Sequence, residues 1–522
     1  MSLNSKYGFV VALGLSLSVF VHAQCPDRPN PGTVVADAPS IVSQNGTLSA
    51  QFTMAQSRDT HGYTHYCYKY SAGNQVVESP TLRLNPGDAL ALNVIDSNNP
   101  PEIGGMKMDM SPAGVPVCGD TGTATVSSTN VHFHGLNVPP KCHQDDVINT
   151  LIQPGSPGFQ YNMRIPAAEP PGLYWYHPHV HGFTEFQVNG GAAGALIVEG
   201  MEKYRPEVAG LTERVFVVRQ QFLVPWVPGP YELTLNYHVA PLIKGQPPII
   251  QMKPGEKQFW RVANATLQDF LQLQFQVNGK PEQLEMIALD GYPLAQTRRQ
   301  NTVSIPPAGR AEFIVQAPPA GASAAFVTNS VSTGPTGNFD EGQTLAKIQP
   351  SDNADGHHMP NAPVLADASA LKFSNLSEQP ATAQWKLYFS EEFGGTNGPI
   401  QFYITVNGQK QKVFEANEKP AIVTKVGAVE DWTIENRALE THAFHIHQIH
   451  FKVLEVDGKP AANQDLLDTI EIPYWEGHGH PYHSVKVRMD FRDPSTAGTF
   501  VFHCHILLHE DLGMMHKILV EP

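Results

Sequence analysis

The chain has 522 residues, which at roughly 150 residues per domain corresponds to about three domains, so a single small module is excluded. Its 43 glycines and 44 prolines exceed average usage and favour a turn-rich, mainly β protein over helical bundles. The 49 acidic residues against 34 basic ones give a net charge of −15, which argues against a polyanionic partner such as nucleic acid or an acidic membrane surface.

Residues 1–23 have the composition of a secretory signal peptide. Lys6 is their only charged residue, an apolar stretch runs from Gly8 to Val21, and the small residue Ala23 ends the segment. We therefore expect cleavage after Ala23 and an exported protein, periplasmic or extracellular. No other apolar run approaches the roughly 18 residues needed to cross a bilayer, so we expect no membrane span.

Export permits disulfide bonds, and four of the five cysteines are candidates for them. Cys25, Cys67, Cys118 and Cys142 allow three connectivities. We favour Cys25–Cys67 with Cys118–Cys142, because the latter two share one segment. Cys504 is left over, and its histidine neighbours indicate a different role.

Three short segments look like copies of one strand. Each follows a glycine, at Gly87, Gly255 and Gly427, and each alternates apolar with polar residues, as in ALALNV after Asp88. Alternation with a period of two is typical of a half-buried strand. Because the glycines are spaced by about one domain length, the pattern predicts a repeat of β-sandwich domains.

Histidines recur in His-x-His pairs. In a strand, residues i and i+2 point to the same face, so each pair directs two imidazoles to one place. Neutral imidazole is a good ligand for copper, iron or zinc. The four pairs are His132 with His134, His177 with His179, His445 with His447, and His503 with His505. The central part of the chain contributes none.

Cys504 lies between two of these histidines, and strand alternation sends its sulfur to the opposite face. His442, His509 and Met514 complete a set of two histidines, one cysteine and a weak thioether. That set is the ligand set of a blue copper electron-transfer centre. An electron leaving Cys504 would have a short covalent route to the histidines on either side of it.

Together these motifs resemble those of the multicopper oxidases, which include laccases. The four segments are HxHG at 132–135, HxH at 177–179, HxxHxH at 442–447 and HCHxxxHxxxxM at 503–514, and the similarity covers essentially the whole mature chain. The resemblance implies four copper ions. It places a type 1 ion on His442, Cys504, His509 and axial Met514, and a type 2 ion on His132 and His445. It places a type 3 pair on His134, His177, His179, His447, His503 and His505.

The resemblance also implies an all-β fold of three consecutive cupredoxin-like Greek-key β-sandwiches, in agreement with the repeat. We expect domain 1 at 24–203, domain 2 at 204–375 without copper ligands, and domain 3 at 376–522, after a signal peptide at 1–23. Domains 1 and 3 would share the cluster.

Reduction of dioxygen consumes protons, so carboxylates are expected near the cluster. Glu510, directly after His509, matches an acid that bacterial members of the family use for this purpose. A second acid is expected in the loop after HxHG, where Asp145 is the first candidate and Asp146 the reserve.

The predicted activity is one-electron oxidation of phenols or aromatic amines coupled to four-electron reduction of dioxygen to water. A metallo-oxidase acting on Cu(I), Fe(II) or Mn(II) is the alternative, with mild support from the acidic charge and from Met106, Met108 and Met110. A copper-sequestering protein without turnover is a further alternative.

Overall fold

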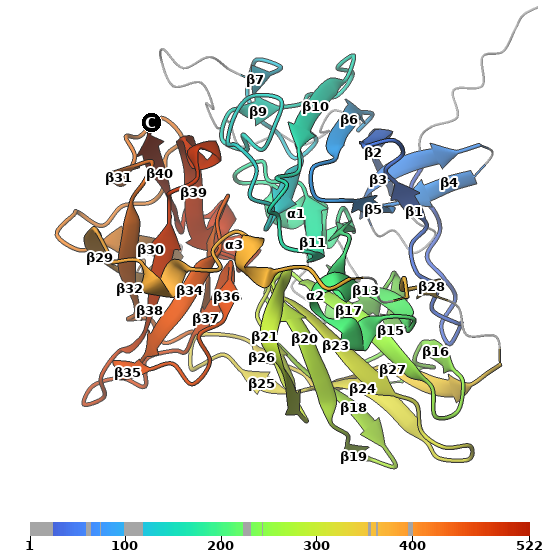
Figure 1. Cartoon of the computed structure of the whole chain (residues 1–522). Coiled ribbons are helices and arrows are strands. Elements are labelled where there is room, and N and C mark those ends of the chain that lie inside the picture. Colours follow the sequence, from blue (N-terminus) through green and yellow to red (C-terminus); the bar gives the residue numbers. More distant parts are fainter. Residues whose placement is uncertain are drawn as a thin grey trace, which may run out of the picture.

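The computed structural model describes residues 24–58, 64–73, 75–98, 118–222, 231–242, 244–352, 356–361, 364–394 and 400–522. The predicted signal peptide and the three methionines at 106, 108 and 110 lie outside these ranges. The described residues form three β-sandwiches in chain order, so the all-β prediction is confirmed (Figure 1). No helix among them is long and apolar enough to cross a membrane.

The first sandwich, blue to cyan in Figure 1, has two five-stranded sheets around a core that includes Phe52, Leu92 and Tyr176. One sheet has the order β1 (Ser40–Val42), β5 (Thr81–Leu84), β12 (Gly194–Val198), β11 (Gly172–His177) and β8 (His132–His134). The other has the order β10 (Phe159–Arg164), β6 (Ala89–Asp96), β2 (Thr47–Arg58), β3 (Thr64–Ala72) and β4 (Gln75–Glu78).

The second sandwich, green to yellow, encloses a core centred on Trp260. Its larger sheet has β15 (His238–Ala240), β14 (Tyr231–Leu235), β13 (Thr212–Phe222), β17 (Lys257–Ala265), β23 (Arg310–Gln316), β20 (Leu284–Leu289) and β21 (Tyr292–Gln300), with β28 (His357–His358) paired to β13. Its smaller sheet has β16 (Ile249–Met252), β27 (Gln343–Pro350), β24 (Ala324–Asn329), β18 (Leu271–Val277) and β19 (Lys280–Pro281), with β22 (Val303–Ile305) paired to β18.

The third sandwich, orange to red, packs around Trp432. One sheet has β30 (Ile400–Val406), β29 (Ala383–Phe393), β32 (Val429–Asn436), β38 (His483–Asp490), β34 (Phe451–Val456) and β35 (Lys459–Pro460), with β36 (Leu466–Leu467) paired to β34. The other has β31 (Ile422–Lys425), β40 (Met515–Glu521), β39 (Gly498–Cys504), β33 (His442–Ile446) and β37 (Thr469–Ile472).

The remaining elements are short. They are the helices α1 (Thr184–Asn189), α2 (Met201–Tyr204) and α3 (Leu507–Asp511), the 3-10 turns at Pro206–Val208, Ala368–Ala370, Leu376–Glu378 and Pro494–Thr496, and the two-residue strands β7 (Cys118–Gly119), β9 (Thr150–Leu151), β25 (Val331–Ser332) and β26 (Phe339–Asp340). The predicted boundary between 203 and 204 falls within α2, and that between 375 and 376 falls at the start of the turn Leu376–Glu378.

The three strands predicted as copies are equivalent in the structure. The strands β6, β17 and β32 each have a parallel neighbour on one side and an antiparallel neighbour on the other. The prediction of a half-buried strand is wrong for β17, which is buried at every position after Lys257. Its second face is covered by the first sandwich, where Ala263 and Ala265 pack against Leu173 and Trp175 of β11.

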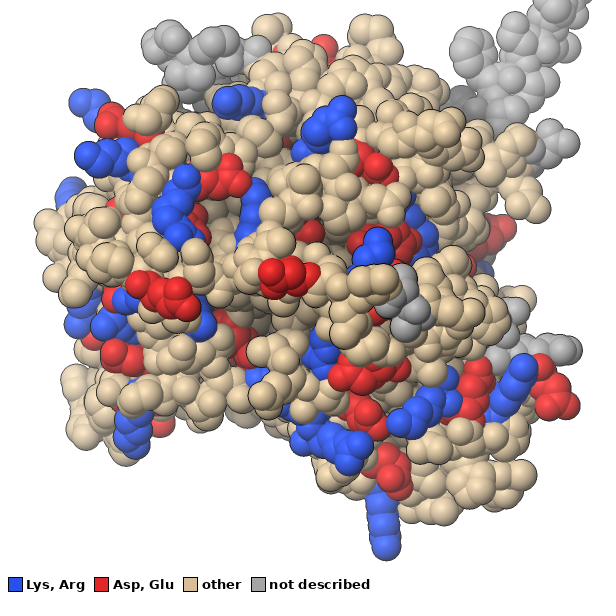
Figure 2. All heavy atoms as spheres, in the orientation of Figure 1, with Lys and Arg blue, Asp and Glu red and all other residues tan. Residues whose placement is uncertain are grey.

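Both favoured disulfides, Cys25–Cys67 and Cys118–Cys142, are present, and Cys504 is a buried free thiol. Over the face shown in Figure 2, acidic and basic side chains of the described residues alternate rather than gather into one broad patch.

Candidate metal centres

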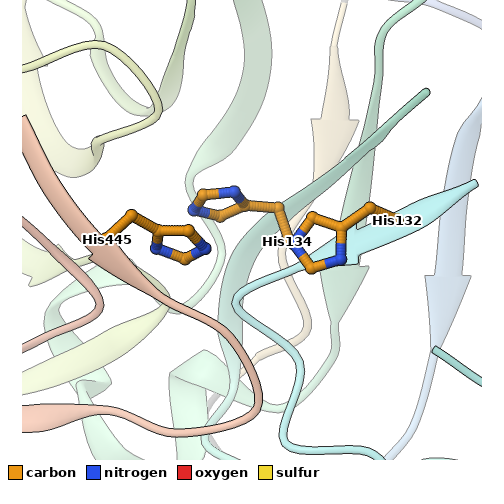
Figure 3. A group of neighbouring side chains, drawn as sticks. All are labelled: His132, His134 and His445. Atoms are coloured by element: carbon orange, nitrogen blue, oxygen red, sulfur yellow. The ribbon is translucent and has the colours of Figure 1, made fainter. Parts of the chain in front are cut away.

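The four His-x-His pairs meet between the first and third sandwiches. Antiparallel pairing sets His132 of β8 beside His177 of β11, and His445 of β33 beside His503 of β39. Across the domain contact, the ring of His134 stacks on that of His445, with the ring centroids 3.9 Å apart. The ring of His132 stacks on that of His447 at the same separation. Figure 3 shows His132 and His134 from β8 next to His445 from β33.

The histidine nitrogens fall into groups that could each hold one ion. In each group the ligand atoms lie within 4.8 Å of one another. Two groups, His134 with His177 and His505, and His179 with His447 and His503, divide the predicted type 3 ligands into two sets of three. A third group contains the predicted type 2 ligands His132 and His445, with His134.

The donor atoms fit a bound cation. Within the described part of the chain, buried ring nitrogens without a hydrogen-bond partner include His132 Nε2, His134 Nδ1, His177 Nε2, His445 Nε2, His447 Nδ1 and both nitrogens of His505. A buried polar atom without a partner is costly, so this many in one place are suited to binding metal ions. His447 Nε2 and His503 Nε2 lie 3.2 Å apart, close to the about 3.3 Å expected for two nitrogens at about 2.0 Å from one tetrahedral ion.

The opposite ring nitrogens of several histidines are held by acceptors. His177 Nδ1 donates to the carbonyl of Pro178 at 2.8 Å, and His503 Nδ1 donates to the carbonyl of Cys504 at 2.9 Å. Since a carbonyl can only accept, each bond fixes the tautomer and leaves Nε2 free as a ligand atom.

Burial also keeps these rings neutral. It lowers the pKa of His177 to about 3 and that of His503 to about 4. The pKa values of His132, His134, His179, His445, His447 and His505 are lowered too, first by burial and then mainly by the neighbouring histidines. Neutral imidazole is the form that binds a metal.

A separate mononuclear site lies on the other face of β39. Cys504 Sγ is 3.6 Å from His442 Nδ1 and 3.9 Å from His509 Nδ1. Sulfur and nitrogen bonded to one tetrahedral ion would lie about 3.6 Å apart. Met514 is buried in the same core cluster as Cys504, and its carbonyl accepts from the Cys504 N–H at 3.0 Å. Burial raises the pKa of the Cys504 thiol, so a cation bound there must displace its proton.

The outward nitrogens of these two histidines face carboxylates. His442 Nε2 lies 3.4 Å from Glu391 Oε1, and His509 Nε2 lies 3.6 Å from Glu440 Oε2. Burial, followed by the charge of Glu391, raises the pKa of Glu440 to about 9. No sequence motif marked this pair, because the two residues come from different strands and loops of the third sandwich.

Asp145 contacts the predicted type 2 ligand directly. Both of its carboxylate oxygens lie 3.0 Å from His132 Nδ1, and it also accepts from the N–H of Phe133 and the amide of Gln448. Burial, and then the neighbouring Asp146, raise its pKa to about 7. The side chain of Asp146 instead accepts from Asn149.

Glu510 is fully buried beside the other end of the cluster. Its Oε1 lies 3.5 Å from His179 Nε2, its Oε2 lies 3.4 Å from His503 Nδ1, and it accepts from the Thr184 hydroxyl at 3.1 Å. Burial, and then Asp511, raise its pKa well above that of an ordinary glutamate.

Asp468 is a site residue that the sequence did not reveal. Its Oδ1 accepts from His134 Nε2 at 3.2 Å, and its backbone carbonyl accepts from His445 Nδ1 at 2.9 Å. Burial alone would raise the pKa of Asp468, but the guanidinium of Arg310 holds it below the ordinary value. Neither residue belongs to a histidine motif, so only the folded structure brings them to the cluster.

Three other histidines of the third domain, His450, His478 and His483, are not part of either centre. His483 lies between Asp457 at 2.9 Å and Glu476 at 3.0 Å, and His478 packs against Trp475. His450 donates to the backbone carbonyl of Asp290 at 2.8 Å and so has a packing role.

Comparison with known families gives three matches along the chain, each described as multicopper oxidase. They cover residues 124–203, 175–353 and 394–522, and so include all four histidine motifs.

Individual relatives align over most of the chain. A multicopper oxidase of Staphylococcus aureus is 24% identical over 494 residues, which cover 89% of this chain and 90% of that protein. A laccase of Bacillus subtilis is 22% identical and covers 75% of this chain and 79% of its own length.

Solved structures share the fold. The Campylobacter jejuni multicopper oxidase, described as a metallo-oxidase, has a TM-score of 0.67 and 22% identity, covering 95% of this chain and 96% of that one. A variant of the Aquifex aeolicus oxidase McoA has a TM-score of 0.69 and 16% identity, covering 94% of this chain and all of its own. The three-sandwich, cupredoxin-like architecture is therefore that of the three-domain multicopper oxidases.

Proposed function

The chain belongs to the multicopper oxidase family, and from this premise we propose that it oxidises phenols or aromatic amines by one electron each and reduces dioxygen to water. Membership implies a copper-dependent oxidoreductase that uses dioxygen. Four substrate molecules would each lose one electron, and dioxygen would take up four electrons and four protons to give two waters.

We assign four copper ions to the two centres. Type 1 copper is assigned to His442, Cys504, His509 and Met514. Type 2 copper is assigned to His132 and His445, and the type 3 pair to the groups His134, His177, His505 and His179, His447, His503, which the grouping of the nitrogens supports. Bound copper supplies reversible one-electron chemistry at the mononuclear site and four-electron reduction of dioxygen at the cluster.

One observation carries the proposal. Cys504 presents its sulfur to His442 and His509, while its covalent neighbours His503 and His505 belong to the two groups of type 3 ligands. An isolated hydrolytic or structural metal site does not require this covalent connection. An oxidase requires it, because it joins the site that collects electrons to the site that consumes them.

The carboxylates next to the cluster are assigned to proton supply. Glu510 lies within 3.5 Å of His179 and His503, and Asp145 lies at 3.0 Å from His132, so the two acids approach the cluster from different sides. A buried carboxyl group within reach of the reacting centre is suited to general acid catalysis. Asp146 is assigned no direct part, because its carboxylate is committed to Asn149.

A second candidate function is oxidation of a metal cation. Glu391 and Glu440 place buried carboxylates against the outer nitrogens of both type 1 histidines, with side chains 3% and 8% exposed. Carboxylates suit Fe(II) or Mn(II), whereas thioethers such as those of Met106, Met108 and Met110 suit Cu(I). A sequestering protein with the same ligands would bind copper but consume no dioxygen.

The assignment is tested by copper stoichiometry and oxygen uptake on the purified, exported protein. We expect about four copper ions per chain and oxygen uptake with a phenol that exceeds uptake with Fe(II), Mn(II) or Cu(I). A lower KM for Fe(II) or Mn(II), raised by Glu391→Gln and Glu440→Gln, would reverse the order of the two candidates. Preference for Cu(I), lost on replacing Met106, Met108 and Met110 by Ala, would also reverse it. One copper ion or none after full loading would refute the assignment.

We also propose export to the periplasm or the outside of the cell, supported by the signal-like residues 1–23 and the two disulfides. Sequencing the N-terminus of the mature protein, expected to begin at Gln24, tests it.

A further inference from the structure

We propose that Arg310, from the middle domain, is a positioning residue for the histidine cluster and acts through Asp468 of the third domain. This inference rests on the proposed copper assignment. It gives the middle domain, which contributes no ligand, a direct part in shaping the site.

Arg310 and Asp468 form a two-pronged ion pair. Arg310 Nη1 donates to Asp468 Oδ1 at 2.6 Å, and Nη2 donates to Oδ2 at 2.5 Å. Both side chains are fully buried. The planar fork of arginine matches a carboxylate in this way, whereas lysine would supply only a point charge.

The pair lies against the turn that follows the first histidine motif. Gly135, next to His134, has a φ of +86°, and a Cβ atom there would lie 2.5 Å from Arg310 Nη2 and 2.7 Å from Asp468 Oδ2. The glycine of the HxHG motif is therefore required by the close approach of this ion pair as well as by the backbone conformation.

Asp468 sets the tautomers of two ligands that come from different domains. Its carboxylate is held by the Arg310 fork and accepts from His134 Nε2, which leaves His134 Nδ1 free. Its backbone carbonyl accepts from His445 Nδ1, which leaves His445 Nε2 free. Both histidines belong to the group of rings in Figure 3. Partners of this kind orient a metal ligand and raise its basicity.

The middle domain also holds the backbone of Asp468. Asp290 Oδ2 accepts from the N–H groups of Asp468 and Thr469, both at 3.2 Å, while its Oδ1 accepts from the Arg310 N–H at 2.8 Å. Arg310 and Asp290 together thus fix the side chain and the main chain of the residue that orients His134 and His445.

Arg261 offers a matched control. It is another fully buried arginine of the middle domain, and it pairs with Glu213 and Glu312 without touching a histidine of the cluster. A role limited to domain docking would make the two arginines equivalent, because both form buried ion pairs near the contact with the first sandwich.

The experiment compares Arg310→Lys, Arg261→Lys and the wild-type full-length protein. Copper affinity is measured by competition with a chelator, and the copper sites are observed by electron paramagnetic resonance and by the blue absorption band. For Arg310→Lys we expect about a 10–100-fold loss of cluster copper affinity and an altered type 2 signal, with the blue band retained. Arg261→Lys is expected to keep wild-type affinity and spectra.

Asp468→Asn is the second variant, and it decides the matter if Arg310→Lys does not fold. Asparagine replaces the carboxylate that accepts from His134, so we expect the same loss of cluster copper affinity. It keeps the side-chain volume and the backbone bond to His445, so the change in the type 2 signal should be smaller. Wild-type affinity and spectra in the folded variants would overturn the positioning role, as would an equal loss in Arg261→Lys. A wild-type protein that takes up no copper would overturn both this inference and the proposed function.

Discussion

Cys504 belongs to two sites at once, because its side chain and its neighbours leave the strand on opposite faces. Its Sγ lies 3.6 Å from His442 Nδ1, while His503 and His505 are among the eight histidines of the cluster. Single residues in this region therefore have separable roles. A substitution at one centre can be followed by spectroscopy while the other centre stays intact.

Cys504→Ser is expected to abolish the blue absorption and the turnover, because serine does not supply the soft thiolate that a blue copper site needs. The cluster ligands remain, so the copper content should fall by about one per chain and no further, as measured by metal analysis. Met514→Leu is the control and should keep the blue colour. A serine variant that stays blue would contradict the type 1 assignment.

Glu510→Gln is expected to lower kcat by about 100-fold or more, because it removes a buried proton donor from the cluster. Copper content and the blue band should not change, since Glu510 is no ligand. Steady-state oxygen uptake gives the rate. Asp146→Asn is the control and should stay within about twofold, because Asp146 faces Asn149. Equal rates in the wild type and Glu510→Gln would exclude this acid from proton supply.

At the scale of secondary structure, α3 ties the third domain to the first. The carboxylate of Asp511, in the last position of α3, accepts from the N–H groups of Gly182, Thr184 and Glu185, where α1 begins. The helix that carries His509 and Glu510 is thereby anchored to the segment that follows His179. This contact supports the position of Glu510 beside Thr184.

Asp511→Ala is expected to destabilise the fold by about 1–3 kcal/mol, because it leaves three partly buried N–H groups at the start of α1 without their acceptor. Urea unfolding of the copper-free protein measures the change. Asp367→Ala is the control, since Asp367 caps the short turn Ala368–Ala370, which has no buried residue, and its loss should cost less. A smaller effect for Asp511 than for Asp367 would show that α3 is anchored by other contacts.

Sequence reasoning succeeded where the signal is local to one element. The i, i+2 spacing of His132 and His134, or of His503 and His505, follows from strand geometry alone, and the structure brings all four pairs together. The alternation after Gly255 correctly predicted a strand. It did not predict that both faces of the strand are buried, because a neighbouring domain covers the second face. Asp468 and Arg310 were missed because their contacts, with the cluster histidines and with each other, join residues that are far apart in the sequence and leave no periodic pattern.

At the scale of the whole molecule, the first and third sandwiches share the cluster while the second joins both by buried contacts. Its Glu312 accepts from the N–H of Leu173 in the first domain at 2.8 Å, and its Arg310 reaches Asp468 in the third. The middle sandwich therefore sets the relative position of its two neighbours.

Removal of copper is expected to lower the Tm, because ions bound between the first and third domains would hold them together and would bind the folded state more tightly than the unfolded chain. A site saturated at about 1,000 times its Kd stabilises the native state by about 4 kcal/mol. Thermal unfolding followed by circular dichroism, before and after chelation and again after copper is restored, gives the shift. An unchanged Tm in the copper-free protein would show that the domain contact alone holds the cluster ligands in place.

The stacking of His134 on His445 and of His132 on His447 has a consequence for how the protein matures. Every group of cluster nitrogens contains histidines from both ends of the chain, so neither end alone forms a complete pocket. A newly made chain has no finished cluster to fill until its last strands have been synthesised and docked on the first domain. We therefore expect the complete cluster to take up its ions late in biogenesis, after the third domain has docked on the first.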